Sequence, residues 1–144
     1  MFTQEDLKPH ETSSVLMWNQ NHELLVMDHR KHGMIAPVIG KCHTGETPVQ
    51  AIIREAQEEV GVTFRESGLL FVGSYTKQYD FGGTKVWVKT NVFNAFSSWT
   101  GEIRNMEPEK HYNLRFLGLA DLFALEKRGL KVADVIRFAL HLLP

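Results

Sequence analysis

The sequence of 144 residues has little of several features that mark particular classes of protein. It contains one cysteine, Cys42, so the intramolecular disulfides that usually hold small secreted domains together cannot form. No apolar run approaches the roughly 20 residues of a membrane-spanning helix, and the first residues show neither the basic start nor the apolar run of a signal peptide. These absences predict a cytoplasmic protein that does not associate with membranes.

The chain also has no excess of charge of either sign. The 16 Lys and Arg residues nearly balance the 17 Asp and Glu residues, for a formal net charge of -1. Proteins that bind DNA or RNA duplexes rely on many Lys and Arg contacts to phosphate, so we expect no such binding here. With 43% hydrophobic residues and no repeat, the chain is expected to form one globular domain over residues 1–144.

The hydrophobic pattern predicts several strands and two helices. A polar tetrad at residues 19–22 separates two short apolar runs and indicates a β-hairpin, whereas residues 132–143 show helical spacing. Pro37 limits its segment to a short or edge strand. The expected strands cover residues 14–18, 23–27, 34–39, 69–75, 86–96 and 115–117. The resulting order, β-β-α-β-β-β-α, predicts an α/β (α+β) fold, an α/β/α sandwich with a mixed β-sheet between helices.

The clearest helix covers residues 48–60. Its apolar residues recur at spacings of three and four, which is typical of one buried helix face. Thr47 is the expected N-cap, with Pro48 at the first helical position and Gln50 completing a capping box. Gly61 can adopt the left-handed conformation that ends a helix.

Four charged residues crowd one side of this helix: Arg54, Glu55, Glu58 and Glu59. Like charges three or four residues apart destabilise an isolated helix by roughly 0.2–0.5 kcal/mol per pair, and folding does not require them. Clustered carboxylates are the ligands that Mg²⁺ selects, usually together with substrate phosphates. The cluster therefore predicts a metal site for a phosphate ester or anhydride; the alternative is a solvated face on which Arg54 pairs with Glu58.

The surrounding residues strengthen the first interpretation. Gly40 is followed after five residues by Glu46, and seven residues later comes Arg54-Glu55-Ala56-Gln57-Glu58-Glu59-Val60-Gly61-Val62. This stretch, residues 40–62, resembles the Nudix box, the signature of the Nudix hydrolases, at every defined position. The resemblance implies a loop-helix-loop against a mixed sheet and an enzyme that cleaves phosphoric anhydride bonds in nucleotides, using Mg²⁺ or Mn²⁺.

Residue roles follow from the same resemblance. Glu55, Glu58 and Glu59 match the metal-binding carboxylates, and the backbone carbonyl next to Gly40, that of Ile39, is a further expected ligand. Arg54 matches a residue that orients the carboxylates, while Glu46 and Gly61 match structural positions of the loop and the helix end. Many relatives have Pro-Gly-Gly where this chain has Val38-Ile39-Gly40, and Glu where it has His43.

Residues outside the box suggest a MutT-like nucleoside triphosphate pyrophosphohydrolase. The run Asn105-Met106-Glu107-Pro108-Glu109-Lys110 resembles a loop of that branch, so Glu107 or Glu109 is a candidate general base. A single domain without an extra N-terminal unit fits the same branch. Candidates for binding the phosphates or stacking on the base of a small-molecule nucleotide are Arg30, Lys31, Lys41, Phe81 and His111, with Trp18 and Trp87 as further aromatic candidates.

Two alternatives remain open. The chain could hydrolyse a nucleoside diphosphate sugar, ADP-ribose or a dinucleotide polyphosphate instead of a triphosphate. It could also be a non-catalytic module that binds a nucleotide or a protein partner. The sequence is compatible with either a monomer or a homodimer, because it shows no signature of an interface.

Overall fold

The computed structural model describes residues 10–142, except for the side chains of Phe81, His141 and Leu142; residues 1–9 and 143–144 are not described. Within the described residues, seven strands form one mixed sheet and two short strands form a second. The strands are β1 (His10–Trp18), β2 (Leu24–His29), β3 (Met34–Ala36), β4 (Val38–Lys41), β5 (Thr63–Phe64), β6 (Leu70–Phe81), β7 (Thr84–Phe96), β8 (Trp99–Thr100) and β9 (His111–Leu117). The helices are α1 (Pro48–Val60), α2 (Leu119–Lys127) and α3 (Asp134–Leu142), with a 3₁₀ turn at Glu66–Gly68.

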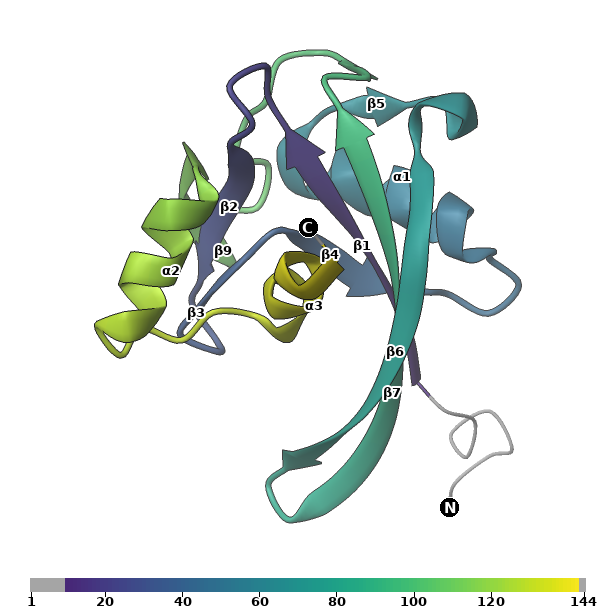
Figure 1. Cartoon of the computed structure of the whole chain (residues 1–144). Coiled ribbons are helices and arrows are strands. Elements are labelled where there is room, and N and C mark those ends of the chain that lie inside the picture. The colour runs from purple at the N-terminus through teal and green to yellow at the C-terminus, as the bar shows by residue number, and fades with distance from the viewer. Residues whose placement is uncertain (1–9, 143–144) are drawn as a thin grey trace.

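Strand β1 is the centre of the large sheet. It runs parallel to β7, from the pair His10 and Val88 to the pair Trp18 and Phe96, and antiparallel to β2 and β4. Strand β2 pairs with both β3 and β9, and β6 pairs with β7 in a long hairpin that extends beyond the rest of the fold (Figure 1). The sheet therefore mixes parallel and antiparallel pairs, as the sequence predicted.

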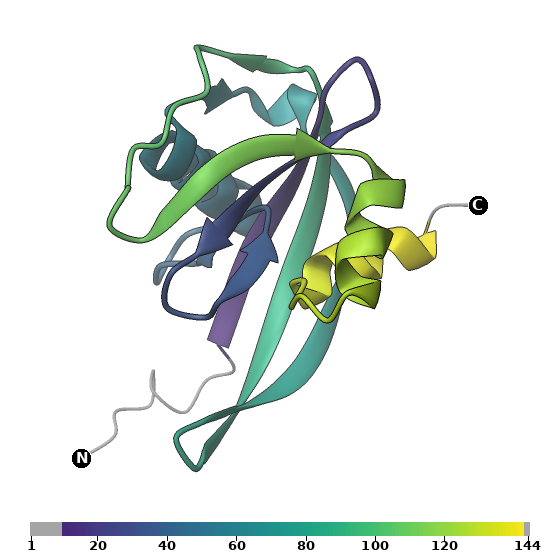
Figure 2. The ribbon, with the colours of Figure 1, turned by 90° about the vertical axis from the view of Figure 1, so that its left-hand side faces the viewer.

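Helices cover both faces of this sheet, because β1 and β2 are apolar on both sides. Val15 and Met17 pack in the cluster beneath α1, whereas Leu16 and Trp18 pack in the cluster beneath α2 and α3. Figure 2 shows the sheet edge-on between α1 on one side and α2 with α3 on the other. The predicted sandwich of a mixed sheet between helices is thus confirmed.

Helix α1 has the ends that its sequence predicts. The Thr47 side chain accepts a hydrogen bond from the Gln50 backbone, and the Gln50 side chain accepts one from the Thr47 backbone, which completes the capping box. Gly61 ends the helix with φ of 73° and donates its N–H to the Gln57 carbonyl. Its buried apolar residues hold α1 against β1 and β4, so its polar side is turned away from the core.

Several elements differ in length or number from the prediction. Strands β6, β7 and β9 begin earlier or end later than their apolar runs, because sheet pairing orders polar residues too. Helix α2 was not predicted: it begins after Gly118 without a side-chain cap and buries only Leu122, so its sequence shows no clear apolar stripe. The segment around Pro37 forms two short strands, β3 and β4, on either side of the proline.

Within the part of the chain that the structure describes, no helix combines the length and apolarity needed to cross a membrane.

Candidate active site

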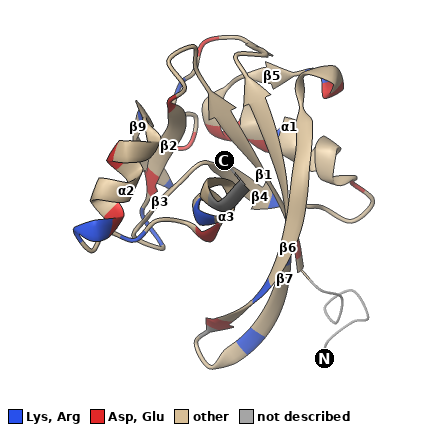
Figure 3. Ribbon diagram, viewed as in Figure 1, with Lys and Arg blue, Asp and Glu red and all other residues tan. Residues whose placement is uncertain are grey.

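The acidic residues of α1 differ widely in exposure. Figure 3 shows acidic segments in red along this helix. Glu59 is buried, with 6% of its surface exposed, whereas half of the Glu58 side chain, 51%, is exposed. Glu55 lies between these extremes with 13% of its side chain exposed. The helix thus presents one carboxylate to the solvent, one at the boundary and one in the interior.

Arg54 holds the outer carboxylates in place. Its Nε and Nη2 atoms donate to the two carboxylate oxygens of Glu46 at 2.8 and 3.0 Å. Its Nη1 atom donates to Glu55 at 2.9 Å and to Glu58 at 3.0 Å, and Nη2 also donates to the carbonyl of Lys41 at 2.8 Å. One guanidinium therefore joins the loop before α1 to two glutamates of that helix. Among side chains, only the planar guanidinium of arginine has the five N–H donors that this requires.

Glu46 is the anchor of this arrangement. Besides the two bonds from Arg54, it accepts a hydrogen bond from the backbone N–H of His43 at 2.8 Å. The Arg54 guanidinium lowers the pKa of the Glu46 carboxyl to about 2, against the opposing effect of burial. Glu46 is therefore ionised throughout the neutral range and links the His43 backbone of the loop to Arg54 of α1.

Gly40 and Glu55 form a tight contact between β4 and α1. A Cβ atom built on Gly40 would overlap the carboxyl group of Glu55, so any larger residue would displace that carboxylate. The neighbouring residue, Ile39, donates its backbone N–H to Glu59. Strand β4 thus lies directly beside two of the three glutamates, with the backbone of Ile39 and Gly40 as its contact surface.

Of the two inner carboxylates, Glu55 is paired with Arg54, whereas Glu59 has no such cationic partner among the described residues. Burial raises the pKa of Glu59 well above its ordinary value, and the nearby Glu55 and Glu107 carboxylates raise it further. Burial also raises the pKa of Glu55, with Glu58 and Glu107 contributing in the same direction. Among the described residues, Oε2 of Glu59 has no hydrogen-bond partner. A buried acceptor of this kind fits a cation, which would both pair it and restore the ionised state.

A loop from outside the box completes the site. Arg104 and Met106 donate their backbone N–H groups to the carbonyls of Val60 and Glu59, so the loop is fastened to the end of α1. Glu107 then lies close enough to Glu59 and His111 for one ligand atom of each to fall within 4.8 Å of the others. Its carboxylate also pairs with Lys110 at 3.0 Å.

The other predicted residues are spread around this centre. Arg30 donates to the Pro108 carbonyl at 3.0 Å and lies over the Tyr112 ring, so it supports the Glu107 loop. Glu109, Lys31 and Lys41 are exposed at the surface. Among the aromatic candidates, Trp18 belongs to the core and Trp87 is 54% exposed, while the Phe81 side chain lies outside the described part. His111 is only 1% exposed, so its ring offers no open face to a base in this conformation.

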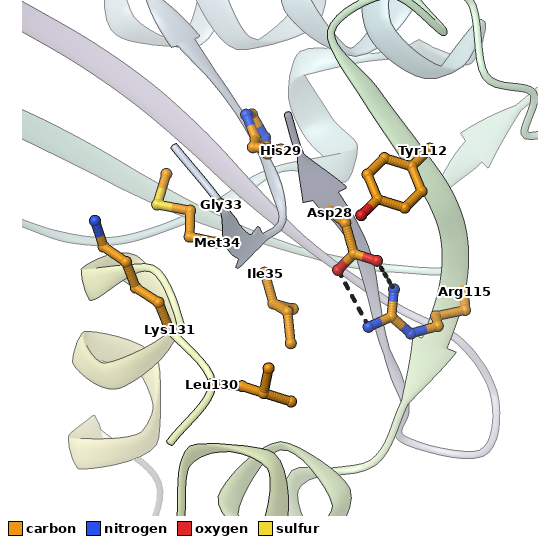
Figure 4. A pocket seen from close by; sticks show the side chains of 9 residues that line it. All are labelled: Asp28, His29, Gly33, Met34, Ile35, Tyr112, Arg115, Leu130 and Lys131. Atoms are coloured by element: carbon orange, nitrogen blue, oxygen red, sulfur yellow. Dashed lines mark hydrogen bonds and ion pairs between the residues drawn. The ribbon is translucent and has the colours of Figure 1, made fainter. Parts of the chain in front are cut away.

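Sequence reasoning did not identify a pocket at the ends of β2 and β9. Figure 4 shows its lining, in which Asp28 pairs with Arg115 and Tyr112 lies beside them. Asp28 and His29 at the end of β2 both line this pocket, together with Ile35 of β3. No periodic pattern in the sequence marks it, because its residues come from distant segments.

A mixed sheet between helices, with a capped acidic helix and an arginine that orders its carboxylates, is the framework of a metal-dependent hydrolase of nucleotide anhydrides. The model of the NUDIX domain matches residues 8–137, and the chain belongs to this family. As such it is a pyrophosphohydrolase that acts on phosphoric anhydride bonds, in agreement with the prediction from residues 40–62.

Solved structures share the fold at low sequence identity. A MutT protein from Bacillus halodurans aligns with a TM-score of 0.69 and 20% identity, over 90% of this chain and 78% of that one. The dihydroneopterin triphosphate pyrophosphohydrolase of E. coli aligns with a TM-score of 0.64 and 19% identity, over 80% of this chain and 84% of that one. An Ap4A hydrolase from C. elegans aligns with a TM-score of 0.58 and 20% identity, over 81% and 84%. A search of curated proteins gives no match.

Proposed function

We propose that this protein hydrolyses a nucleoside triphosphate to the nucleoside monophosphate and pyrophosphate, in the cytoplasm and with Mg²⁺ or Mn²⁺ as its cofactor. The observation that carries the proposal is the convergence of Glu55, Glu59 and Glu107 beside Gly40 of β4, with the buried Oε2 of Glu59 lacking a hydrogen-bond partner among the described residues. Such a site would repel a triphosphate by itself, so it requires divalent cations between protein and substrate.

The residues fit the cations that the family uses. Glu55, Glu58 and Glu59 would hold them, together with the backbone carbonyl of Ile39 beside Gly40. When bound, such ions lower the pKa of coordinated water and offset the charge of the leaving phosphate. Arg54 keeps Glu55 and Glu58 in fixed positions through its bonds at 2.9 and 3.0 Å, so little reorganisation is needed when the substrate enters.

Glu107 rather than Glu109 is the loop carboxylate that we assign to the reaction centre. Glu107 raises the pKa of both Glu55 and Glu59, which requires that it lie near them, whereas Glu109 is exposed. Arg30 contacts the Glu107 loop at the Pro108 carbonyl and Lys110 pairs with Glu107, so both are candidates to bind the outer phosphates. Lys31 and Lys41, which are exposed, are further candidates for that role.

The triphosphate is favoured over other anhydrides by the Glu107 loop and by the name of one similar structure, a triphosphate pyrophosphohydrolase. Another similar structure is named as an Ap4A hydrolase, so a dinucleotide polyphosphate is the second candidate. Nucleoside diphosphate sugars and ADP-ribose are further candidates of the same reaction type. A non-catalytic nucleotide-binding module is the contrasting class, although three carboxylates held toward cations serve no purpose in it.

A substrate panel tests the proposal. Canonical and oxidised triphosphates, nucleotide sugars, ADP-ribose and dinucleotide polyphosphates are incubated with the protein at roughly millimolar Mg²⁺, and phosphate is measured with and without added pyrophosphatase. We expect phosphate from a triphosphate only when pyrophosphatase is present. Direct release of phosphate, or turnover confined to diphosphate-linked substrates, would contradict the proposal, and binding without turnover would favour the non-catalytic module.

Glu58→Gln tests the assignment of the carboxylates. Glu58 is half exposed, so the variant should fold normally, yet turnover should fall at least a hundredfold if the group serves the cations, since each 1.36 kcal/mol of barrier is about tenfold in rate. Glu102→Gln, at another exposed glutamate near the end of α1, is the matched control and should keep its activity. Equal turnover in both variants would refute the role of Glu58.

A further inference from the structure

His111 is a buried histidine with no visible partner for its ring. Its surface is 1% exposed, and neither Nδ1 nor Nε2 has a hydrogen-bond partner among the described residues. A neutral imidazole carries one donor and one acceptor, and leaving both unpaired in the interior is costly. The ring is therefore placed for a ligand rather than for packing alone.

Two carboxylates face this ring. One ring nitrogen of His111, one oxygen of Glu59 and one oxygen of Glu107 lie within 4.8 Å of one another. Glu59 is 6% exposed, and its Oε2 lacks a partner as well. Three potential ligand atoms thus lie close together, one each from Glu59 of α1, Glu107 of the loop and His111 at the start of β9.

We propose that His111, Glu59 and Glu107 together form a mixed imidazole and carboxylate site for a divalent transition-metal ion. This inference rests on the proposed function, because it refines the metal centre of that reaction. An imidazole ligand favours Mn²⁺, Co²⁺ or Zn²⁺ over Mg²⁺, which prefers oxygen ligands. The chain would accordingly select a softer ion than an all-oxygen site does.

The surroundings of the ring suit this role. His29 lies directly opposite His111 in the pairing of β2 and β9, with the two ring centroids 6.0 Å apart. The His111 carbonyl accepts a hydrogen bond from the Asn105 side chain at 2.8 Å, which fixes the backbone of the proposed ligand.

An ion has a path to the site along Glu107. The Glu107 side chain is 20% exposed, and its present partner, Lys110, is 65% exposed on a flexible stem. A divalent ion would replace the Lys110 ammonium as the partner of Glu107, without rearrangement of the core. Glu107 then serves the reaction centre as a ligand of the ion.

Pulsed EPR of the Mn²⁺-loaded full-length protein tests the ligand directly. We expect a hyperfine coupling from one imidazole ¹⁴N, which should change to that of ¹⁵N when the protein is labelled with ¹⁵N-histidine. The unlabelled wild-type protein needs no mutation for this measurement, so misfolding of a variant cannot obscure the answer. Bound Mn²⁺ with no nitrogen coupling would overturn the inference.

Two variants identify the histidine. His111→Gln should lose the nitrogen coupling and bind Co²⁺ at least tenfold more weakly, with a smaller change for Mg²⁺. His29→Gln is the matched control, since His29 is the neighbouring histidine, its ring centroid 6.0 Å from that of His111, and should keep the coupling. Loss of the coupling in His29→Gln but not in His111→Gln would also overturn the assignment.

The outcomes separate this inference from the proposed function. Pyrophosphate release with Mg²⁺ and no nitrogen coupling with Mn²⁺ would leave the proposed function standing and remove the role of His111. A nitrogen coupling that depends on His111, in a protein that releases no pyrophosphate from any triphosphate, would establish the metal site and remove the proposed reaction.

Discussion

The contact between Gly40 and Glu55 gives the sharpest test of how the site is built. In Gly40→Ala the new methyl group would overlap the Glu55 carboxyl group, which must leave its position. A forced side-chain torsion costs about 0.5–1.5 kcal/mol, and losing the charged hydrogen bond from Arg54 costs about 1.5–3 kcal/mol. Alanine loses less conformational entropy than glycine when a strand forms, which offsets this cost by about 0.5–1 kcal/mol. We therefore expect Gly40→Ala to be destabilised by about 1–4 kcal/mol.

A double-mutant cycle isolates this contact from other effects of the substitution. Glu55→Ala removes the group that the methyl would strike, so in that background Gly40→Ala should be neutral or stabilising. The coupling free energy between the two positions should be at least about 1 kcal/mol, within the range measured for residues in contact. Urea unfolding of the four proteins in EDTA, followed by tryptophan fluorescence, gives the four free energies of unfolding.

Gly118→Ala provides the control for this cycle. Gly118 has φ of -73°, and a Cβ atom there would lie 3.7 Å from the Asp121 carboxylate, an ordinary contact. Its effect on stability should be the same with and without Glu55. If Gly40→Ala also lowers the free energy of unfolding by the same amount with and without Glu55, the absence of a side chain at Gly40 does not make room for the Glu55 carboxylate. Our interpretation of the site would then be wrong.

Two further predictions concern charged groups. Arg54→Lys should lower the free energy of unfolding by about 1–3 kcal/mol and kcat/KM at least tenfold, because one ammonium cannot replace the bonds to Glu46, Glu55 and Glu58. Urea unfolding and substrate hydrolysis measure the two effects, and wild-type values in both would refute the prediction. Burial alone would raise the pKa of Asp134, but hydrogen bonds from Lys77 and Tyr79 outweigh it and lower that pKa. The stabilisation that ionised Asp134 contributes is therefore complete well above pH about 4 and disappears as the pH falls through the lowered pKa. The free energies of unfolding of the wild-type protein and of Asp134→Asn should thus converge in acid. A difference that stays constant with pH would contradict the assignment.

The fold was largely predictable because its information is local. The capping box, the glycine after α1 and the short apolar runs of β1 and β2 each lie within a few residues of sequence. Helix α2 could not be predicted in this way, since its apolar residues follow no stripe and most stay partly exposed. The small sheet of β5 and β8 was missed as well, because two-residue strands have no period.

The candidate site was predictable only in part, for the same reason. Residues 40–62 are contiguous, so spacing alone placed the box glutamates and Arg54 together. Glu107 and His111 meet Glu59 through backbone bonds that fasten a distant loop to the end of α1, and no spacing rule records such bonds. The sequence suggested His111 as a base-stacking residue because aromatic rings often serve that role; the fold instead buries it among carboxylates.

The burial gradient along α1 connects stability with chemistry. A carboxylate as deep as Glu59, with an unpaired oxygen and a raised pKa, destabilises the metal-free fold in its ionised form. Glu58 is half exposed, and both Glu55 and Glu58 are paired with Arg54. On the proposed function, a cation bound at Glu59 would stabilise the ionised form of this carboxylate, so cation binding and folding would stabilise each other through it. The repulsion between like charges that the sequence predicts along α1 would then be offset at its most buried member.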